Sequence, residues 1–148
     1  MRNFKCNGSI WVHCEQPLRS ENDYLVGFDI RSQGLNRVLN SAKPIDLQWD
    51  LKTYRNEKSV SYENRFAEIN YKYGDAKYSY VNSHGQGKEE TPEKVDYIAF
   101  KQHFFATILQ TNTSFEKSQL VSQNLVKDEK IDTVYTKQFR ANVPLAFS

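Results

Sequence analysis

The chain has 148 residues and a mass of 17.3 kDa, which is the size of one ordinary domain. Its net charge of +2 is too small for a globally basic nucleic-acid binder or a polybasic membrane-surface protein, so we expect no nucleic-acid partner. Aromatic residues make up 14% of the chain, which argues against disorder. With no apolar run approaching the ~18 residues of a spanning helix, and no apolar core of signal-peptide length, the chain is expected neither to span a membrane nor to target itself.

Apolar and polar residues alternate at five places, which predicts half-buried strands of an antiparallel sheet. The five segments are residues 24–30, 45–51, 67–73, 78–80 and 143–147. Turn-forming residues separate them, among them Gly74-Asp75 and the polar tract 82–87. Because no βαβ rhythm is present, the pattern predicts an all-β antiparallel sandwich, in a single domain over residues 1–148.

Two stretches depart from this pattern. Residues 55–65 are polar and predict either an irregular excursion or one short helix. Within residues 95–109, aromatic and aliphatic residues recur at helical spacing, but residues 104–109 also make a good buried strand. The neighbouring strands favour two strands joined near residues 101–103. The residues that we expect to be largely buried between the sheets are Phe28, Trp49, Ile69, Phe104 and Phe105.

The sequence offers no recognisable metal or cofactor site. The three histidines, His13, His84 and His103, lie far apart, and none has a partner at metal-ligand spacing. Cys6 and Cys14 lack the close pairing of a structural zinc site, and two thiols do not fix the redox compartment. We therefore expect no metal, no cofactor and no catalytic residue.

One glycine-rich segment and one charged segment are not interpreted as functional sites. The tract Gly85-Gln-Gly87-Lys88 lacks the spacing of a phosphate-binding loop. The charged run of Glu89, Glu90 and Glu93 beside Pro92 is interpreted as a solvated loop.

Carboxylates and tyrosines leave a carbohydrate alternative open. Asp46, Asp50 and Glu68 fall on the polar faces of strands, where solubility is the simplest explanation, although two carboxylates on a sandwich could serve a sugar enzyme. The nine tyrosines could form a binding face for carbohydrate or peptide, but cross-strand packing is the favoured explanation.

Residues 95–105, Val-Asp-Tyr-Ile-Ala-Phe-Lys-Gln-His-Phe-Phe, resemble a motif in the large periplasmic domain of bacterial YidC membrane-protein insertases. In that motif an aromatic residue, a short apolar step and a Lys-Gln-x-aromatic-Phe run precede a strand. The segment 24–30 followed by Leu47-Gln-Trp49 looks like another part of the family. Residues 55–58 with Glu63, and later 71–73, look like the version in Bacteroidetes-type members. The resemblance covers about residues 22–148, whereas residues 1–21 fit less well.

The resemblance implies a β-supersandwich similar to galactose-mutarotase-like folds. It further implies a fragment of the periplasmic domain of an inner-membrane protein from a Gram-negative bacterium, joined to the membrane only through helices that lie outside this chain. The residues carried over as structural members of the family motif are Trp49, Tyr97, Phe100, Lys101, Gln102, Phe104 and Phe105.

Two functions follow as alternatives. In the first, the chain is a non-catalytic insertase module that acts as a docking or chaperone-like surface for the Sec translocon or for nascent membrane proteins. In the second, it is a carbohydrate-binding or carbohydrate-active sandwich. Two carboxylates about 5–10 Å apart in a cleft beside an exposed aromatic platform would favour the second. An exposed sheet edge and an apolar patch would favour the first.

Overall fold

A computed structural model describes residues 4–6, 10–15, 24, 29–31, 44–81 and 86–145, and the chain divides into two compact units, Met1–Lys43 and Pro44–Ser148. In the first unit, β1 (Phe4–Cys6), β2 (Ile10–Glu15) and β3 (Asp29–Arg31) form an antiparallel sheet in that order. Of the strand predicted for residues 24–30, Ile30 lies in β3 and Tyr24 in no strand. Phe28 lies outside the described residues.

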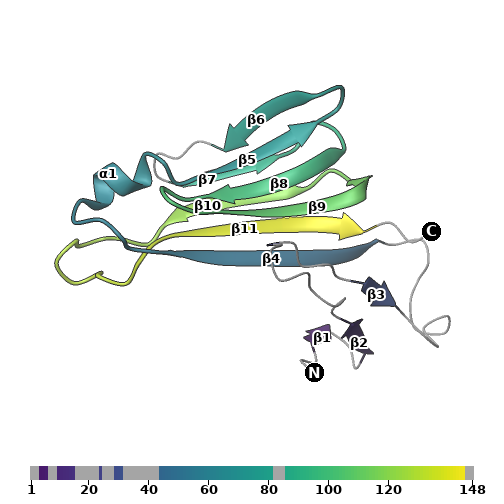
Figure 1. The fold of residues 1–148 in the computed structure, drawn as a ribbon, viewed down its shortest axis with the longest axis horizontal. Helices are drawn as coiled ribbons and strands as arrows, with labels where there is room; N and C mark the ends of the chain where they lie inside the picture. The colour runs from purple at the N-terminus through teal and green to yellow at the C-terminus, as the bar shows by residue number, and fades with distance from the viewer. Residues whose placement is uncertain are drawn as a thin grey trace. The chain divides into compact units, whose positions relative to one another are not determined.

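The second unit is a sandwich of two antiparallel sheets with one short helix (Figure 1). Sheet 1 has the order β4-β11-β10-β7, and sheet 2 has the order β6-β5-β8-β9. The strands of sheet 1 are β4 (Ile45–Tyr54), β7 (Gly87–Glu90), β10 (Gln119–Asn124) and β11 (Tyr135–Leu145). The strands of sheet 2 are β5 (Glu68–Tyr73), β6 (Lys77–Val81), β8 (Val95–Lys101) and β9 (Ala106–Phe115). The predicted all-β antiparallel sandwich is confirmed.

The helix α1 (Val60–Asn64) falls within residues 55–65, where the sequence left a short helix open. Ser59 caps its amino-terminal end, because the Ser59 hydroxyl accepts a hydrogen bond from the Tyr62 N–H at 3.3 Å. None of the helices in the described part of the chain is long and apolar enough to cross a bilayer.

Side chains from both sheets meet in one core. Ile69 and Tyr71 alternate inward on β5 and are fully buried, as the period-two pattern predicts for Ile69. The ring of Trp49 on β4 stacks on Phe100 on β8 with 3.9 Å between centroids and 11° between planes. Phe100 also lies 5.4 Å from the ring of Phe139 on β11. These contacts tie the two sheets together, and Trp49 is partly buried against the core.

The ambiguous stretch 95–109 is two strands, β8 and β9, and not a helix. A register shift between Val95 and Tyr97 places Val95, Ile98 and Phe100 all in the buried core. The residues at helical spacing, Tyr97, Phe100, Phe104 and Ile108, do not share a buried face, since only Phe100 is completely buried.

The prediction that Phe104 and Phe105 are buried is wrong. Strand β9 begins only at Ala106, so both rings belong to the turn between β8 and β9. The Gln102 N–H closes that turn on the Phe105 carbonyl at 2.7 Å. Phe104 and Phe105 are 59% and 63% exposed, because a turn at the end of the sandwich has no facing sheet to cover it.

The interpretation of the charged run as a solvated loop is also wrong in part. Glu89 and Glu90 lie in β7, which pairs with β10. Glu89 points inward, where its carboxylate accepts a hydrogen bond from the buried Tyr71 hydroxyl. The outward side chains of this charged edge strand stay in water. Because its inward face is polar too, the strand shows no apolar–polar alternation in the sequence.

Candidate functional site

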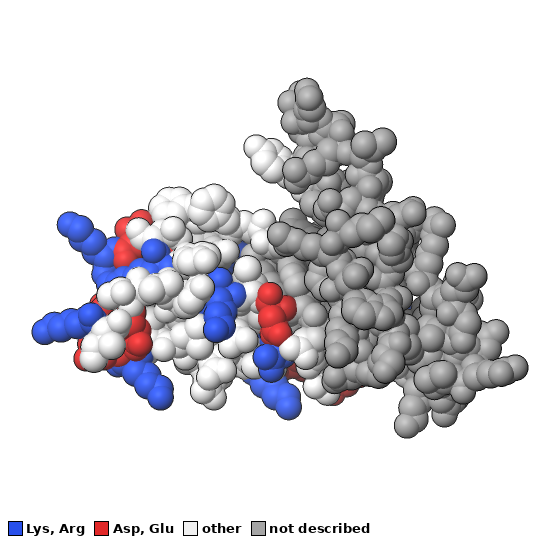
Figure 2. Space-filling model, turned by 90° about the horizontal axis from the view of Figure 1, so that it is seen from below, with Lys and Arg blue, Asp and Glu red and all other residues white. Residues whose placement is uncertain are grey.

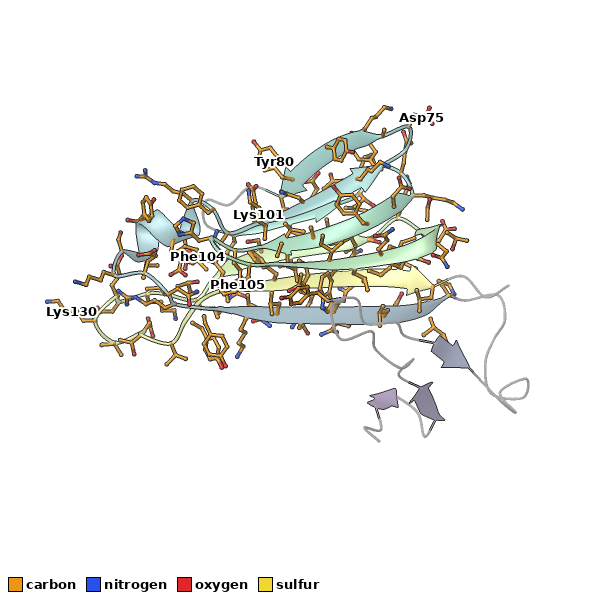
Figure 3. The ribbon with its side chains drawn as sticks, viewed as in Figure 1. Asp75, Tyr80, Lys101, Phe104, Phe105 and Lys130 are labelled. Carbon is orange, nitrogen blue, oxygen red and sulfur yellow. The ribbon has the colours of Figure 1, made fainter. Side chains whose placement is uncertain are left out.

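The turn between β8 and β9 packs its side chains against α1 and forms an exposed aromatic patch. We define this patch as Tyr62, Phe66, His103, Phe104 and Phe105 (Figure 3). It lies at one end of the sandwich, where Figure 3 places Phe104 and Phe105 beside each other near the helix.

His103 organises the aromatic patch by stacking on two rings. Its ring lies 4.4 Å from Phe66 at 10° between planes, and 4.3 Å from Phe104 at 27°. Tyr62 meets His103 edge-on, with 5.5 Å between centroids. The Nδ1 atom of His103 is 3.7 Å from a Glu57 carboxylate oxygen, which is close enough for an ion pair when the imidazole is protonated. His103 therefore holds Phe104 in place by stacking between it and Phe66.

The helix end beneath the aromatic patch is held by a buried carboxylate. Glu63 is 3% exposed, and its two oxygens accept hydrogen bonds from the backbone N–H groups of Asn56 and Glu57 at 3.0–3.3 Å. The Asn56 side-chain amide adds a third donor at 3.2 Å. The segment that carries Tyr62 is thereby fixed to the end of β4.

The aromatic patch is suited to contact with another surface. Tyr62 is 46% exposed, and together with the two phenylalanines it presents large apolar rings to solvent. Exposed apolar groups that gather in one place mark interaction sites more often than scattered ones do. Basic and acidic side chains are interspersed over the described part of the face in Figure 2, so charge of one sign does not dominate that view.

The seven family-motif residues divide between core, turn and surface. Trp49 and Phe100 form the stacked pair of the core, and Tyr97 is half-buried on β8. The Lys101 ammonium lies 3.4 Å from the Glu68 carboxylate on the neighbouring strand. Gln102, Phe104 and Phe105 form the turn. The motif residues of the turn thus lie at or beside the aromatic patch, whereas Trp49 packs against the core.

The carboxylates considered for sugar chemistry do not come together as a pair in a cleft. Asp50 and Glu68 lie on the outer faces of different sheets. Each forms an ion pair, Asp50 with Arg140 at 2.7 Å and Glu68 with Lys101. Asp46 is exposed on β4. Within residues 44–81 and 86–145 and the shorter described segments, no group of three or more His, Cys, Asp or Glu side chains could hold a metal.

Two buried ionisable groups lie in the core: Lys137 was missed from the sequence, whereas Tyr71 lies on the apolar face predicted for residues 67–73. Lys137 is 1% exposed, and its ammonium donates to the carbonyls of Ala67 at 2.8 Å and Asn64 at 3.2 Å. Burial lowers the pKa of Lys137 to about 8. Burial, followed by the hydrogen bond to Glu89, raises the pKa of Tyr71 to about 12. The alternation on β11 could have revealed Lys137, because it shares the inward face with the buried residues that follow it.

Comparison with known proteins identifies relatives for most of the chain. It is 29% identical over 127 residues to the membrane protein insertase YidC of Bacteroides fragilis, and 28% identical over 125 residues to that of Phocaeicola vulgatus. The corresponding protein of Porphyromonas gingivalis is 29% identical over 104 residues. This chain is similar to part of an insertase. The resemblance seen in the sequence is therefore confirmed.

The similarity covers 85% of this chain but only 20% of the Bacteroides fragilis YidC, so the chain spans about a fifth of the length of such relatives. The similarity to the Porphyromonas gingivalis YidC covers 69% of this chain and 17% of that relative. No family model matches the chain, and no solved structure matches it. The likeness of this fold to galactose-mutarotase-like supersandwiches therefore stays a prediction.

Proposed function

We propose that this chain is a non-catalytic part of a YidC-type membrane-protein insertase, in which it docks protein partners or shields apolar segments of nascent membrane proteins. The observation that carries the proposal is the exposed aromatic patch, which includes the largely exposed Phe104 and Phe105. The similarity to insertases over 85% of the chain supports the assignment of the parent protein. The dispersed carboxylates favour this role over a carbohydrate-active sandwich.

The physical chemistry of membrane insertion supports a positioning role. Polar groups that ease a nascent helix into lipid must lie at membrane depth, because the hydrocarbon core offers no water to satisfy them. A sandwich that faces water positions partners or holds their exposed apolar segments. We place it in the periplasm, as part of an inner-membrane protein of a Gram-negative bacterium, with the Sec translocon and nascent membrane proteins as its partners.

The contact with those partners is expected to be small and transient. A net charge of +2 gives little long-range steering, so association depends on the local apolar patch. A few exposed rings bury an area at the low end of protein interfaces, below about 1,200 Å².

The test removes the matching segment from the Bacteroides fragilis insertase, in cells depleted of the native protein. We expect insertion of a simple single-span substrate to be largely retained and co-purification of the translocon to fall. A collapse of insertion by a truncated protein that is made and folded correctly would contradict the proposal. As a matched control, the intact insertase carrying this chain in place of its own segment should restore co-purification.

A further inference from the structure

Two tyrosine rings face each other where strands β4 and β11 pair. Tyr54 ends β4, Tyr135 begins β11, and the two residues are partners in the antiparallel register. Their ring centroids lie 4.9 Å apart, with 41° between the ring planes. Tyr135 raises the pKa of the Tyr54 hydroxyl, first through a side-chain hydrogen bond and then through a coulombic interaction. The two rings and their hydroxyl groups are therefore close neighbours.

This pair combines ring contact with access from water. Tyr54 is 60% exposed, and Tyr135 is half-buried. The other contact between two tyrosine rings among the described residues joins Tyr71 and Tyr73, with 5.7 Å between centroids. Tyr71 is only 1% exposed, so a dissolved reagent reaches the Tyr54–Tyr135 pair but not the ring of Tyr71.

We propose that Tyr54 and Tyr135 form a site of oxidative cross-linking, at which a one-electron oxidant joins the rings as dityrosine and fastens β4 to β11. Each phenol gives one electron to the oxidant and one proton to water, and the two phenoxyl radicals form a carbon–carbon bond between the ring carbons beside their oxygens. Each of these carbons then passes its hydrogen to the oxygen as a proton, which restores both aromatic rings. The protein loses two hydrogen atoms in total, and two equivalents of the oxidant, such as the oxidised haem of a peroxidase, are reduced.

The contact between the rings favours a link within one molecule over a link between two. Groups held close to their reacting geometry react as if each were present at a very high local concentration. Rings with centroids 4.9 Å apart need only small rotations about their side-chain bonds to bring the reacting carbons together. A radical formed on Tyr54 therefore meets Tyr135 before it meets a second chain. The inference goes beyond the proposed function, because it requires neither a partner protein nor the aromatic patch.

The cross-link would act on an edge strand of the sandwich. β4 lies at the edge of sheet 1 and pairs there with β11 (Figure 1). A bond between residues 54 and 135 closes a loop that contains α1 and the six strands from β5 to β10. Closing so long a loop restricts the unfolded chain, as a disulfide does. Oxidation at this site is therefore expected to stabilise the folded sandwich.

The test treats the purified 148-residue chain with a haem peroxidase and hydrogen peroxide, and then separates the monomer from covalent dimers. We expect the monomer to gain dityrosine fluorescence, to lose the mass of two hydrogen atoms, and to yield on digestion one peptide that joins residues 54 and 135. Tyr54→Phe removes the hydroxyl that the oxidation needs and should lower the dityrosine yield in the monomer about tenfold or more. Tyr62→Phe is the matched control, because Tyr62 is also exposed but its ring contacts Phe66 and His103. This control should keep the yield within about twofold of the wild type.

Denaturant titration of the cross-linked monomer supplies the second readout. The cross-linked wild type should unfold at a higher denaturant concentration than the untreated chain, whereas peroxidase treatment of Tyr54→Phe should leave its midpoint unchanged. Equal dityrosine yields from the wild type and Tyr54→Phe, a digest that joins other tyrosines, dityrosine confined to covalent dimers, or an unchanged midpoint of the cross-linked wild type would overturn the proposal. Phe105→Ala in the aromatic patch should cross-link normally, which separates this test from that of the proposed function.

Discussion

Two phenylalanines five positions apart illustrate how position in the fold sets the energetic role of a residue. Phe100 is completely buried and stacks on Trp49, whereas Phe105 is 63% exposed. We expect Phe100→Ala to lower the free energy of unfolding by about 3–5 kcal/mol. Phe105→Ala should change it by less than about 0.5 kcal/mol. Denaturant titration of both variants checks this, and a large loss for Phe105→Ala would show that its ring is buried.

The buried Lys137 makes stability depend on pH in a specific window. In the folded state its pKa is about 8, whereas in the unfolded chain a lysine holds its proton to about pH 10.4. Between these values the unfolded chain binds more protons, so stability rises with pH. Below about pH 8 the cost of burying the charged lysine is fully present.

Measuring the free energy of unfolding from pH 7 to pH 10 tests this expectation. Lys137→Met should remove the rise, up to about 3 kcal/mol, that this lysine contributes. Lys130→Met, which changes an exposed lysine, should leave the rise intact. A parallel pH dependence in the wild type and in Lys137→Met would disprove the assignment.

At the scale of elements, α1 depends on a carboxylate that lies inside the fold. Glu63→Ala should lower the free energy of unfolding by about 1–3 kcal/mol, because the N–H groups of Asn56 and Glu57 lose their acceptor. Glu129→Ala removes an exposed carboxylate and should cost less than about 0.5 kcal/mol. Equal effects of the two changes in thermal unfolding would mean that Glu63 does not hold the helix.

Period-two alternation predicted β4 and β5 because each has an apolar face turned inward and a polar face turned outward. It also located β6, but the predicted facing is wrong there, since Tyr78 and Tyr80 are 68% and 60% exposed. It failed for β7 and β10, whose outward and inward residues are both largely polar. The partly buried Glu89 accepts a hydrogen bond there from Tyr71 of the opposite sheet, a contact that no local pattern records. The aromatic patch was missed for a related reason, since the boundary between strand and turn at residues 102–106 decides whether Phe104 and Phe105 are covered.

At the largest scale, the sandwich of the unit Pro44–Ser148 combines a buried core with apolar rings that the described residues leave exposed. The core is closed around Phe100 and Phe139, while the aromatic patch at one end presents rings to solvent. This division is expected of a module that positions partners rather than one that transforms a substrate. We propose that partner proteins contact the aromatic patch.

Site-specific photo-crosslinking tests that claim most directly. The Bacteroides fragilis insertase would carry this chain in place of its matching segment, with a photoreactive phenylalanine analogue at Phe105 or at Gln48 on the polar face of β4. We expect crosslinks to translocon subunits or nascent membrane proteins from position 105, and little product from position 48. Equal yields from both positions, or products from position 48 alone, would contradict it.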